Sequence, residues 1–184
     1  MKICLLYIAL ANHENTTNHA ARFASTYQEN LPGVQHDTII ICQGGPLSHE
    51  QAALFSAINP QFWPRPNDGG YDIAAYIAAA KTVAADYEMV LCAGESVHFW
   101  KEGWLKPFVD AFEKYGDKGL YGNAASFENC AIDPQPWPNP HIRTPCFATS
   151  PKVLRRFPFE IVTREQAGYF ESGRWNVHLW YEER

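Results

Sequence analysis

Acidic side chains flank two adjacent glycines in the segment 67–72, which reads NDGGYD. Two glycines allow the backbone to approach a ligand closely, and the free amides at the start of a helix attract negative charge. The carboxylates of Asp68 and Asp72 can accept hydrogen bonds from a ribose or from the edge of a base. A simpler interpretation makes one of these aspartates the cap of a helix that follows a glycine turn. The spacing matches neither a P-loop nor a dinucleotide fingerprint, so this segment alone leaves both interpretations open.

A second polar turn, AGES at 93–96, follows the apolar run 88–92. The single carboxylate of Glu95 can bind Mg²⁺ or Mn²⁺ when phosphate groups supply the other ligands. The alternative is that Glu95 is an ordinary exposed loop residue. The turn therefore predicts a cation site that depends on a phosphate-bearing ligand beside it.

Two charged residues in the second half of the chain are further candidates. Arg143 follows the proline-rich loop 129–140, and its guanidinium group can pair with a phosphate in bidentate fashion. The alternative partner is one of the twenty acidic residues of the sequence. Glu171 lies within the sequence FESG, where Gly173 can let the chain turn so that the carboxylate points into a cleft. The alternative for Glu171 is a carboxylate at a helix end on a solvated face.

Alternating strands and helices are predicted to position these residues. Apolar and β-branched runs predict strands near residues 2–10, 37–42, 88–92, 119–122 and 143–150. Helical spacing predicts helices over 14–30, 48–58, 71–85 and 102–115, with short helices starting near residues 151 and 163. The prolines at 60, 64 and 66 predict an irregular, extended stretch between two of these elements.

This alternation predicts an α/β fold of three layers, a mostly parallel sheet with helices on both faces. Ligands of such sheets bind outside the carboxyl ends of the strands. We therefore expect one rim of the sheet to carry the segments 11–14, 43–45, 66–72 and 93–97.

The composition narrows the class of protein. With 184 residues, 46% hydrophobic and 19% charged, the sequence predicts a single domain over residues 1–184. The formal net charge of −5 argues against nucleic acid or an anionic membrane as a partner. No apolar run reaches the roughly 20 residues of a membrane-spanning helix, so no integral membrane segment is expected. The five cysteines are odd in number and lack metal-binding or redox spacing, which favours a reduced, cytoplasmic protein.

Several sequence elements between residues 67 and 173 together resemble a known family. They are NDGGYD at 67–72, the AGE turn, GWL at 103–105, YG at 121–122, PHIRT at 140–144 and FESG at 170–173. In this order they resemble GT-A glycosyltransferases of the nucleotide-diphospho-sugar transferase superfamily, most closely a bacterial group of glycosyltransferase-like proteins. The resemblance implies a Rossmann-like GT-A fold with a nucleotide-sugar donor as partner. The donor would be bound by Asn67, Asp68, Asp72, Ser96 and Arg143.

The resemblance also implies a reaction. GT-A enzymes usually carry Asp-x-Asp at the end of the strand after the helix, and its carboxylates hold a divalent metal that neutralises the donor diphosphate. This chain has Ala93-Gly94-Glu95 there, so the first carboxylate is missing and Glu95 is the expected ligand of Mg²⁺ or Mn²⁺. Glu171 matches a late carboxylate that acts as general base in inverting members. The implied function is transfer of a sugar to the hydroxyl group of a saccharide or other acceptor.

Two other functions stay open from the sequence. A catalytically inactive protein of the same fold would bind a nucleotide sugar without transferring it, and the missing carboxylate and short chain favour this alternative. A cysteine hydrolase would use Cys42, which precedes QGG at 43–45, with histidine and aspartate side chains assembled in space. The sequence contains no strained nucleophile turn, which makes the hydrolase the weaker alternative.

Overall fold

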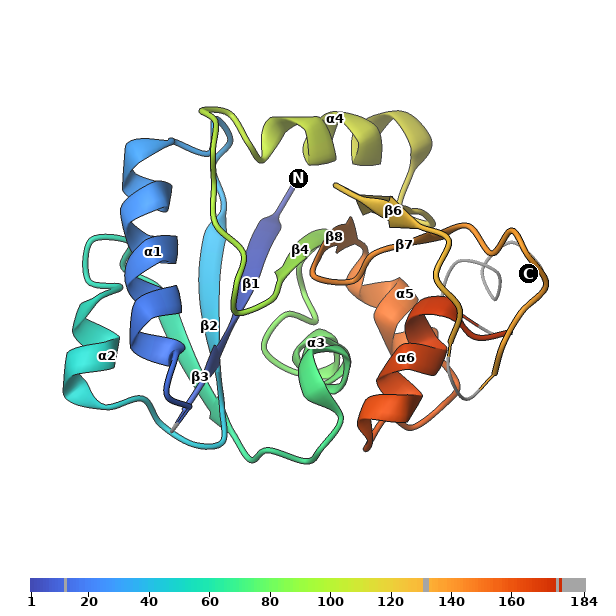
Figure 1. The fold of residues 1–184 in the computed structure, drawn as a ribbon. Helices are drawn as coiled ribbons and strands as arrows, with labels where there is room; N and C mark the ends of the chain where they lie inside the picture. Colours follow the sequence, from blue (N-terminus) through green and yellow to red (C-terminus); the bar gives the residue numbers. More distant parts are fainter. Residues whose placement is uncertain (12, 131–132, 175, 177–184) are drawn as a thin grey trace.

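A six-stranded sheet forms the centre of the molecule (Figure 1). The computed structural model describes residues 1–11, 13–130, 133–174 and 176. In their order across the sheet the strands are β3 (Gln61–Arg65), β2 (Asp37–Gln43), β1 (Ile3–Leu10), β4 (Met89–Ala93), β8 (Cys146–Thr149) and β5 (Leu120–Gly122).

The sheet is mostly parallel, as the alternation of strands and helices predicts. The pairs β1–β2, β1–β4 and β2–β3 are parallel, and β8 runs antiparallel to both of its neighbours. The strand β1 is apolar along its length because it lies at the centre of the sheet with both faces covered. Its alternate residues belong to two different cores, one on each face.

Helices cover both faces of the sheet, which gives the three layers expected from the sequence (Figure 1). Side chains from α1 (Thr16–Glu29) and α4 (Lys106–Tyr115) pack on one face together with Phe55, which follows α2 (His49–Ala53). The other face is covered by α3 (Tyr71–Lys81), α5 (Pro151–Arg156) and α6 (Arg164–Ser172). Apolar spacing places Phe23 and Phe112 inward from their helices, where each is buried.

Several predicted elements differ from those of the structure. The stretch with Pro64, expected to be irregular, forms β3, which is tolerated because an edge strand has one side without a partner strand. The helix predicted over 71–85 ends at Lys81, and the helix predicted over 48–58 is regular only over 49–53. The helix predicted from 102 starts at Lys106, and the strand predicted over 143–150 is limited to β8. A small sheet of β6 (Ala125–Ser126) and β7 (His141–Ile142) was not predicted, since its strands have two residues each.

The cysteine-hydrolase alternative is wrong. Cys42 is 1% exposed within β2, and its thiol donates to the carbonyl oxygen of Ile40. Burial raises the pKa of the Cys42 thiol, whereas a nucleophile needs an accessible thiolate. All five cysteines are free and buried, so each acts as a small apolar side chain. Among the described residues, no helix has both the length and the apolar character that crossing a membrane requires.

Candidate functional site

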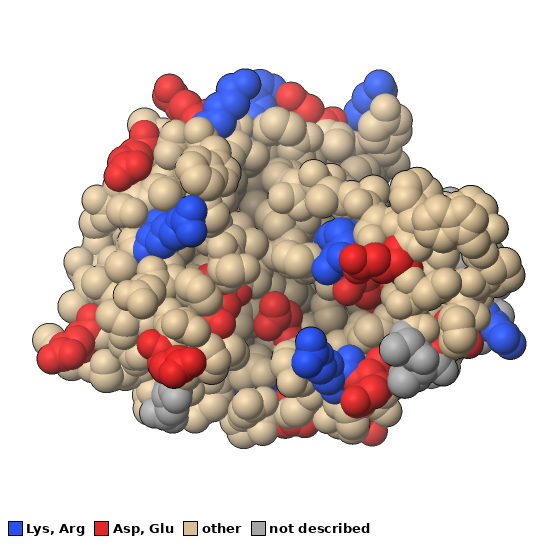
Figure 2. Space-filling view, viewed as in Figure 1, with Lys and Arg blue, Asp and Glu red and all other residues tan. Residues whose placement is uncertain are grey.

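The carboxyl ends of the four parallel strands meet at one edge of the sheet. Leu10 at the end of β1 pairs with Gln43 of β2, which in turn pairs with Arg65 of β3. On the other side of β1, Ala93 at the end of β4 pairs with Tyr7. The segments that follow these strands contain the charged and amide side chains predicted to form a rim. Figure 2 shows that the face in view is hollowed between the α1 side and the α6 side, with acidic atoms inside the hollow.

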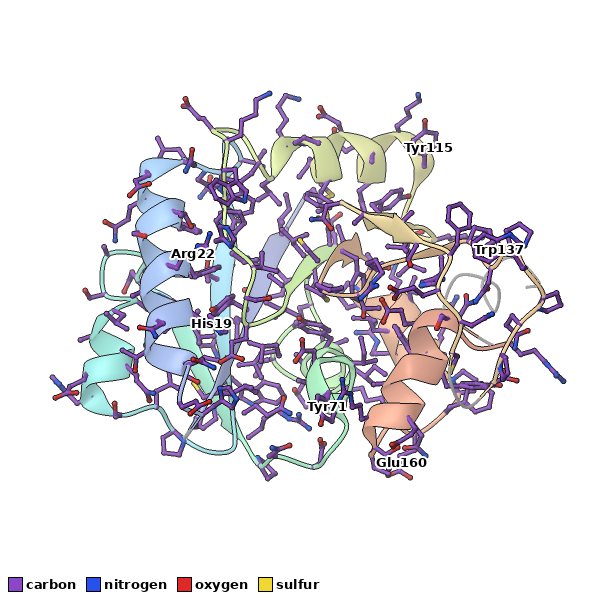
Figure 3. The ribbon with its side chains drawn as sticks, in the orientation of Figure 1. His19, Arg22, Tyr71, Tyr115, Trp137 and Glu160 are labelled. Atoms are coloured by element: carbon purple, nitrogen blue, oxygen red, sulfur yellow. The ribbon has the colours of Figure 1, made fainter. Side chains whose placement is uncertain are left out.

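Glu95 is held at the start of α1. The hydroxyl of Thr16 lies 3.1 Å from Glu95 Oε1 and 2.5 Å from the carbonyl oxygen of Leu10, so its one proton is shared between two acceptors. The Nδ1 atoms of His19 and His13 lie 3.5 Å and 3.9 Å from the same oxygen. In Figure 3, His19 projects from α1 toward the centre of the molecule. The Glu95 side chain is only 14% exposed, so it is not the ordinary exposed loop residue of the alternative interpretation.

The backbone at Glu95 is fixed as well. The buried hydroxyl of Tyr7 donates to the Glu95 carbonyl oxygen at 2.6 Å. The neighbouring Gly94 donates its N–H to the carbonyl oxygen of Pro145 at 2.8 Å. Ser96, predicted to contact the donor, is exposed next to Glu95, and its carbonyl oxygen contacts His98 Nδ1 at 3.1 Å. The turn after β4 is therefore held by hydrogen bonds to β1 on one side and to the residue before β8 on the other.

Asp72 brings a second carboxylate to this turn. A Cβ atom placed on Gly94 would lie 2.9 Å from Asp72 Oδ2, so glycine leaves the room that this carboxylate occupies. Burial, and then the charge of Glu95, raise the pKa of Asp72 from 3.8 to about 6. Although the sequence lacks a carboxylate at position 93, α3 places one beside residue 94. The structure thus brings Asp72 and Glu95 into one site.

The pair suits a divalent cation only in part. In the described part of the chain, no group of three or more histidine, cysteine or acidic side chains is arranged to hold a metal ion. Mg²⁺ commonly binds through one or two carboxylates while substrate phosphates and water complete its shell. Asp72 and Glu95 meet that smaller requirement.

Asn67 and Asp68 serve the turn in which they lie. Asn67 Oδ1 accepts from the Gln43 amide at 3.4 Å and from the Gly69 N–H at 3.2 Å. Asp68 Oδ1 accepts from the Gly70 N–H at 3.2 Å, and its other oxygen forms an ion pair with the buried Arg65. Both side chains lie at the rim, but their contacts are within the turn. Neither aspartate caps α3, because its N-cap is Gly70 and no side chain caps it. Arg65 was not predicted, because a buried arginine in a strand gives no sequence signal of its partner.

The backbone between these residues and α3 is unusual. Gly69 has a φ of +81° and Tyr71 a φ of +52°, a backbone region that residues other than glycine rarely adopt. The Tyr71 side chain is 51% exposed at the first position of the helix, and Figure 3 labels it there. Such a conformation persists only when the surroundings fix it, and it is commonest at functional sites.

Replacing Gly70 with Ala is expected to lower the free energy of unfolding by about 1–3 kcal/mol. An added Cβ would overlap the carbonyl oxygen of Ile161 and the side chain of Ala74. Gly168→Ala, within α6, is the matched control, because the added Cβ would meet only Cys130 Sγ, at 3.9 Å. This substitution should raise the free energy of unfolding by about 0.5–1 kcal/mol. Urea denaturation of both variants measures the difference. Equal stabilities would contradict the close packing of the start of α3 described above.

Arg143 and Glu171 lie next to the acidic pair but contact each other. Arg143 Nη1 donates to Glu128 Oε2 at 2.5 Å, and its Nε lies 2.9 Å from Glu171 Oε1. The same Glu171 oxygen accepts from the Thr144 N–H at 3.1 Å. The next residue, Pro145, is the one bonded to Gly94, which connects this cluster to the turn of Glu95. In this structure the charge of Arg143 is therefore taken up by two carboxylates.

The sequence prediction missed the residues at and before the start of α1 that face Glu95. His13, Thr16 and His19 recur every three residues from the end of the first strand, a spacing that favours one face of a helix. That periodicity was the available signal. Their convergence on Glu95, 79 residues further along from Thr16, depends on the pairing of β1 with β4.

The Asp72 carboxyl predicts a specific dependence of stability on pH. Its pKa of about 6 in the folded protein lies above the ordinary 3.8, so the folded state binds the proton more tightly than the unfolded state does. The free energy of unfolding should therefore fall as the pH rises from about 4 through about 6. Asp72→Asn should remove about 1–3 kcal/mol of this fall, since one pKa unit corresponds to about 1.4 kcal/mol.

Urea denaturation of wild type and Asp72→Asn between pH 4 and pH 8 measures this difference. Asp86→Asn, at an exposed position before β4 and thus at the opposite edge of the sheet, is the control. An unchanged pH profile in Asp72→Asn would show that its carboxyl group is not buried beside Glu95.

Comparisons with known proteins concern the fold. The sequence matches no protein family and no curated protein. Residues 1–349 of TarS from S. aureus are similar in structure, with a TM-score of 0.58 and 12% identity over 91% of this chain and 53% of that chain. Glucosyl-3-phosphoglycerate synthase from Mycobacterium tuberculosis, in complex with UDP, gives 0.57 and 13% over 92% and 65%. CMP:2-keto-3-deoxy-manno-octonic acid synthetase, complexed with CTP, gives 0.57 and 9% over 91% and 82%.

The likeness to these three structures establishes a shared GT-A-like α/β fold, in agreement with the fold that the sequence resemblance implies. The chain spans about half the length of the TarS structure that it matches. At 9–13% identity the comparison speaks for the fold alone.

Proposed function

We propose that the protein transfers a sugar from a nucleotide-diphospho-sugar donor to a hydroxyl group of an acceptor. The observation that carries this proposal is the carboxylate pair of Asp72 and Glu95 beside Gly94, at the carboxyl edge of a GT-A-like sheet. Ligands of parallel sheets bind at that edge. Two similar structures, those with UDP and CTP, contain nucleotides, which supports a nucleotide as part of the donor.

Asp72 and Glu95 would hold Mg²⁺ or Mn²⁺ together with the diphosphate of the donor. When bound, the cation neutralises the negative charge that grows on the leaving diphosphate. Burial, and to a lesser degree the charge of Glu95, raise the pKa of Asp72, so a cation bound between the two carboxylates would favour its ionised form. Thr16 and His19 would keep the Glu95 carboxylate oriented toward the ligand.

The remaining donor contacts involve side chains that now have protein partners. Asn67 and Asp68 would shape the turn before α3 at the donor site, because their side chains accept hydrogen bonds from the Gly69 and Gly70 N–H groups. Ser96 is exposed beside Glu95 and is free to donate its hydroxyl to the ligand. Arg143 would exchange one of its carboxylate partners for a phosphate, because both are charge-assisted contacts of similar geometry.

Glu171 is the proposed general base. Its Oε1 is held by the Thr144 N–H and by Arg143, which fixes the direction of the carboxylate. The base would accept the proton of the acceptor hydroxyl as that oxygen attacks the anomeric carbon of the donor, and the nucleoside diphosphate would leave. This direct displacement inverts the configuration at that carbon.

A second candidate function is binding of a nucleotide sugar without transfer. The observation that favours it is the ion pair of Arg143 with Glu171, which occupies both the proposed phosphate-binding group and the proposed base. The two candidates predict the same donor binding and differ in turnover.

Thermal unfolding with a panel of nucleotide sugars, each with and without Mn²⁺, tests the proposal. A donor that binds only the folded state raises its stability by about 2.7 kcal/mol at a hundredfold excess over Kd. The Mn²⁺-dependent part of that shift should disappear in the double variant Asp72→Asn/Glu95→Gln and persist in Asp86→Asn. No shift with any donor would contradict both candidates, and a shift without release of nucleoside diphosphate would favour binding alone.

A further inference from the structure

A second hollow lies between α4 and the strands β5 and β7. Its volume is about 520 Å³, within the range of roughly 300–1,000 Å³ typical of small-molecule pockets. Its wall is mainly apolar, and none of the described residues that line it is charged. The lining side chains used below are Trp104, Phe108, Ala111, Leu120, Tyr121 and Ile142.

The wall of this α4 pocket is preformed. The Trp104 indole donates to the carbonyl oxygen of Asn30 at 2.9 Å, and its ring stacks on Phe99 with the centroids 3.6 Å apart. The Tyr121 hydroxyl donates to the carbonyl oxygen of Gly116 at 2.6 Å. The aromatic rings are therefore fixed before any ligand arrives, which reduces the entropy lost on binding.

Strand register places the α4 pocket beside the donor site. Gly122 at the end of β5 pairs with Phe147 of β8, and Phe147 pairs with Cys92 of β4. Gly122 and Cys92 are therefore two interstrand spacings apart, roughly 10 Å, and Glu95 lies three residues further along the chain from Cys92. Ile142 in the pocket wall is followed directly by Arg143, which contacts Glu171. The wall of the α4 pocket is thus linked to the proposed base through Ile142 and Arg143.

We propose that the α4 pocket binds an uncharged, apolar part of the acceptor, an alkyl chain or aromatic ring attached to the group that bears the reacting hydroxyl. This inference rests on the proposed function for the identity of the ligand as an acceptor. The apolar wall disfavours a charged group such as a second diphosphate. Removal of an alkyl or aromatic surface from water supplies the free energy of binding. The spacing of roughly 10 Å across the sheet, together with the three residues from Cys92 to Glu95, leaves room for the reacting sugar groups between the pocket and the diphosphate site.

Two glycosides that share a head group test the pocket itself. n-Octyl β-D-glucoside, used below its critical micelle concentration, should bind at least about tenfold more tightly than methyl β-D-glucoside, because only the octyl chain fills the α4 pocket. Titration followed by ¹H–¹⁵N NMR should move the amide signals of Leu120, Tyr121 and Ile142. Equal affinities of the two glycosides would overturn the inference.

Substitutions on α4 locate the binding. Ala111→Phe fills the pocket from its wall and should weaken octyl glucoside binding at least about tenfold, whereas Glu113→Phe adds the same ring at an exposed position outside the lining and should leave binding unchanged. Phe108→Ala, which removes wall surface, should also weaken binding and serves if Ala111→Phe does not fold. Unchanged binding in the folded pocket variants would overturn the inference.

The same titration separates this inference from the proposed function. Glu95→Gln should bind octyl glucoside as wild type does, because Glu95 is not part of the pocket wall. Donor-dependent thermal shifts without octyl glucoside binding would overturn the inference about the α4 pocket and leave the proposed function intact. Octyl glucoside binding without any donor shift would keep the pocket as an apolar ligand site and remove its role as an acceptor site.

Discussion

Replacing Glu95 with Gln is expected to lower kcat/KM for the donor by about 10²–10³-fold. The substitution keeps the shape of the side chain and the contact with Thr16, but it removes one of two carboxylates next to Gly94. A cation held at a leaving phosphate supplies several kcal/mol of transition-state stabilisation, and each 1.36 kcal/mol corresponds to a factor of ten. Steady-state release of nucleoside diphosphate, measured over a range of Mn²⁺ concentrations, gives both kcat and the apparent Mn²⁺ affinity.

Glu14→Gln is the matched control for this result. Glu14 lies in the same rim segment as His13 but is exposed, so its loss should leave kcat/KM within about twofold. Retention of full activity and full Mn²⁺ dependence in Glu95→Gln would remove Glu95 from the proposed site. A loss of activity that excess Mn²⁺ restores would instead be the behaviour of a weakened metal ligand.

The sheet was predictable because its central strands carry their own signal. The run 3–10 is buried on both faces and therefore reads as a continuous apolar segment, and the same holds for β2 and β4. The strand β3 was missed because its exposed side chains and Pro64 resemble an irregular segment, and only its position at the edge of the sheet makes them acceptable. Two-residue strands such as β6 have no periodicity to detect.

The candidate site was predictable only where it follows strand ends. Glu95 and Asp72 flank elements that the pattern located, so their approach follows from a parallel sheet. The missing carboxylate of the Asp-x-Asp element could not be reassigned from sequence, because the position of Asp72 beside Gly94 depends on how α3 docks. The partners of Arg143 could not be predicted from the sequence either, since Glu128 and Glu171 are 15 and 28 positions away along the chain.

The second large effect is expected from Glu171→Gln, which should lower kcat by about 10²–10⁴-fold while donor affinity stays nearly unchanged. Glutamine preserves the volume of the side chain and can still accept from the Thr144 N–H, but it cannot take the proton of the acceptor hydroxyl. Single-turnover measurements with saturating donor isolate the chemical step, and equilibrium titration with the donor gives Kd.

Glu128→Gln separates a base from a residue that only positions Arg143. Both carboxylates contact the same guanidinium group, yet the Glu128 side chain is 72% exposed and Glu171 only 20%. If Glu171 is the base, Glu128→Gln should keep kcat within a few-fold of wild type, since the remaining carboxylate still orients Arg143. If both carboxylates act only through Arg143, the two substitutions should instead change donor Kd by similar factors and leave kcat alike. A normal single-turnover rate in Glu171→Gln would eliminate Glu171 as the base.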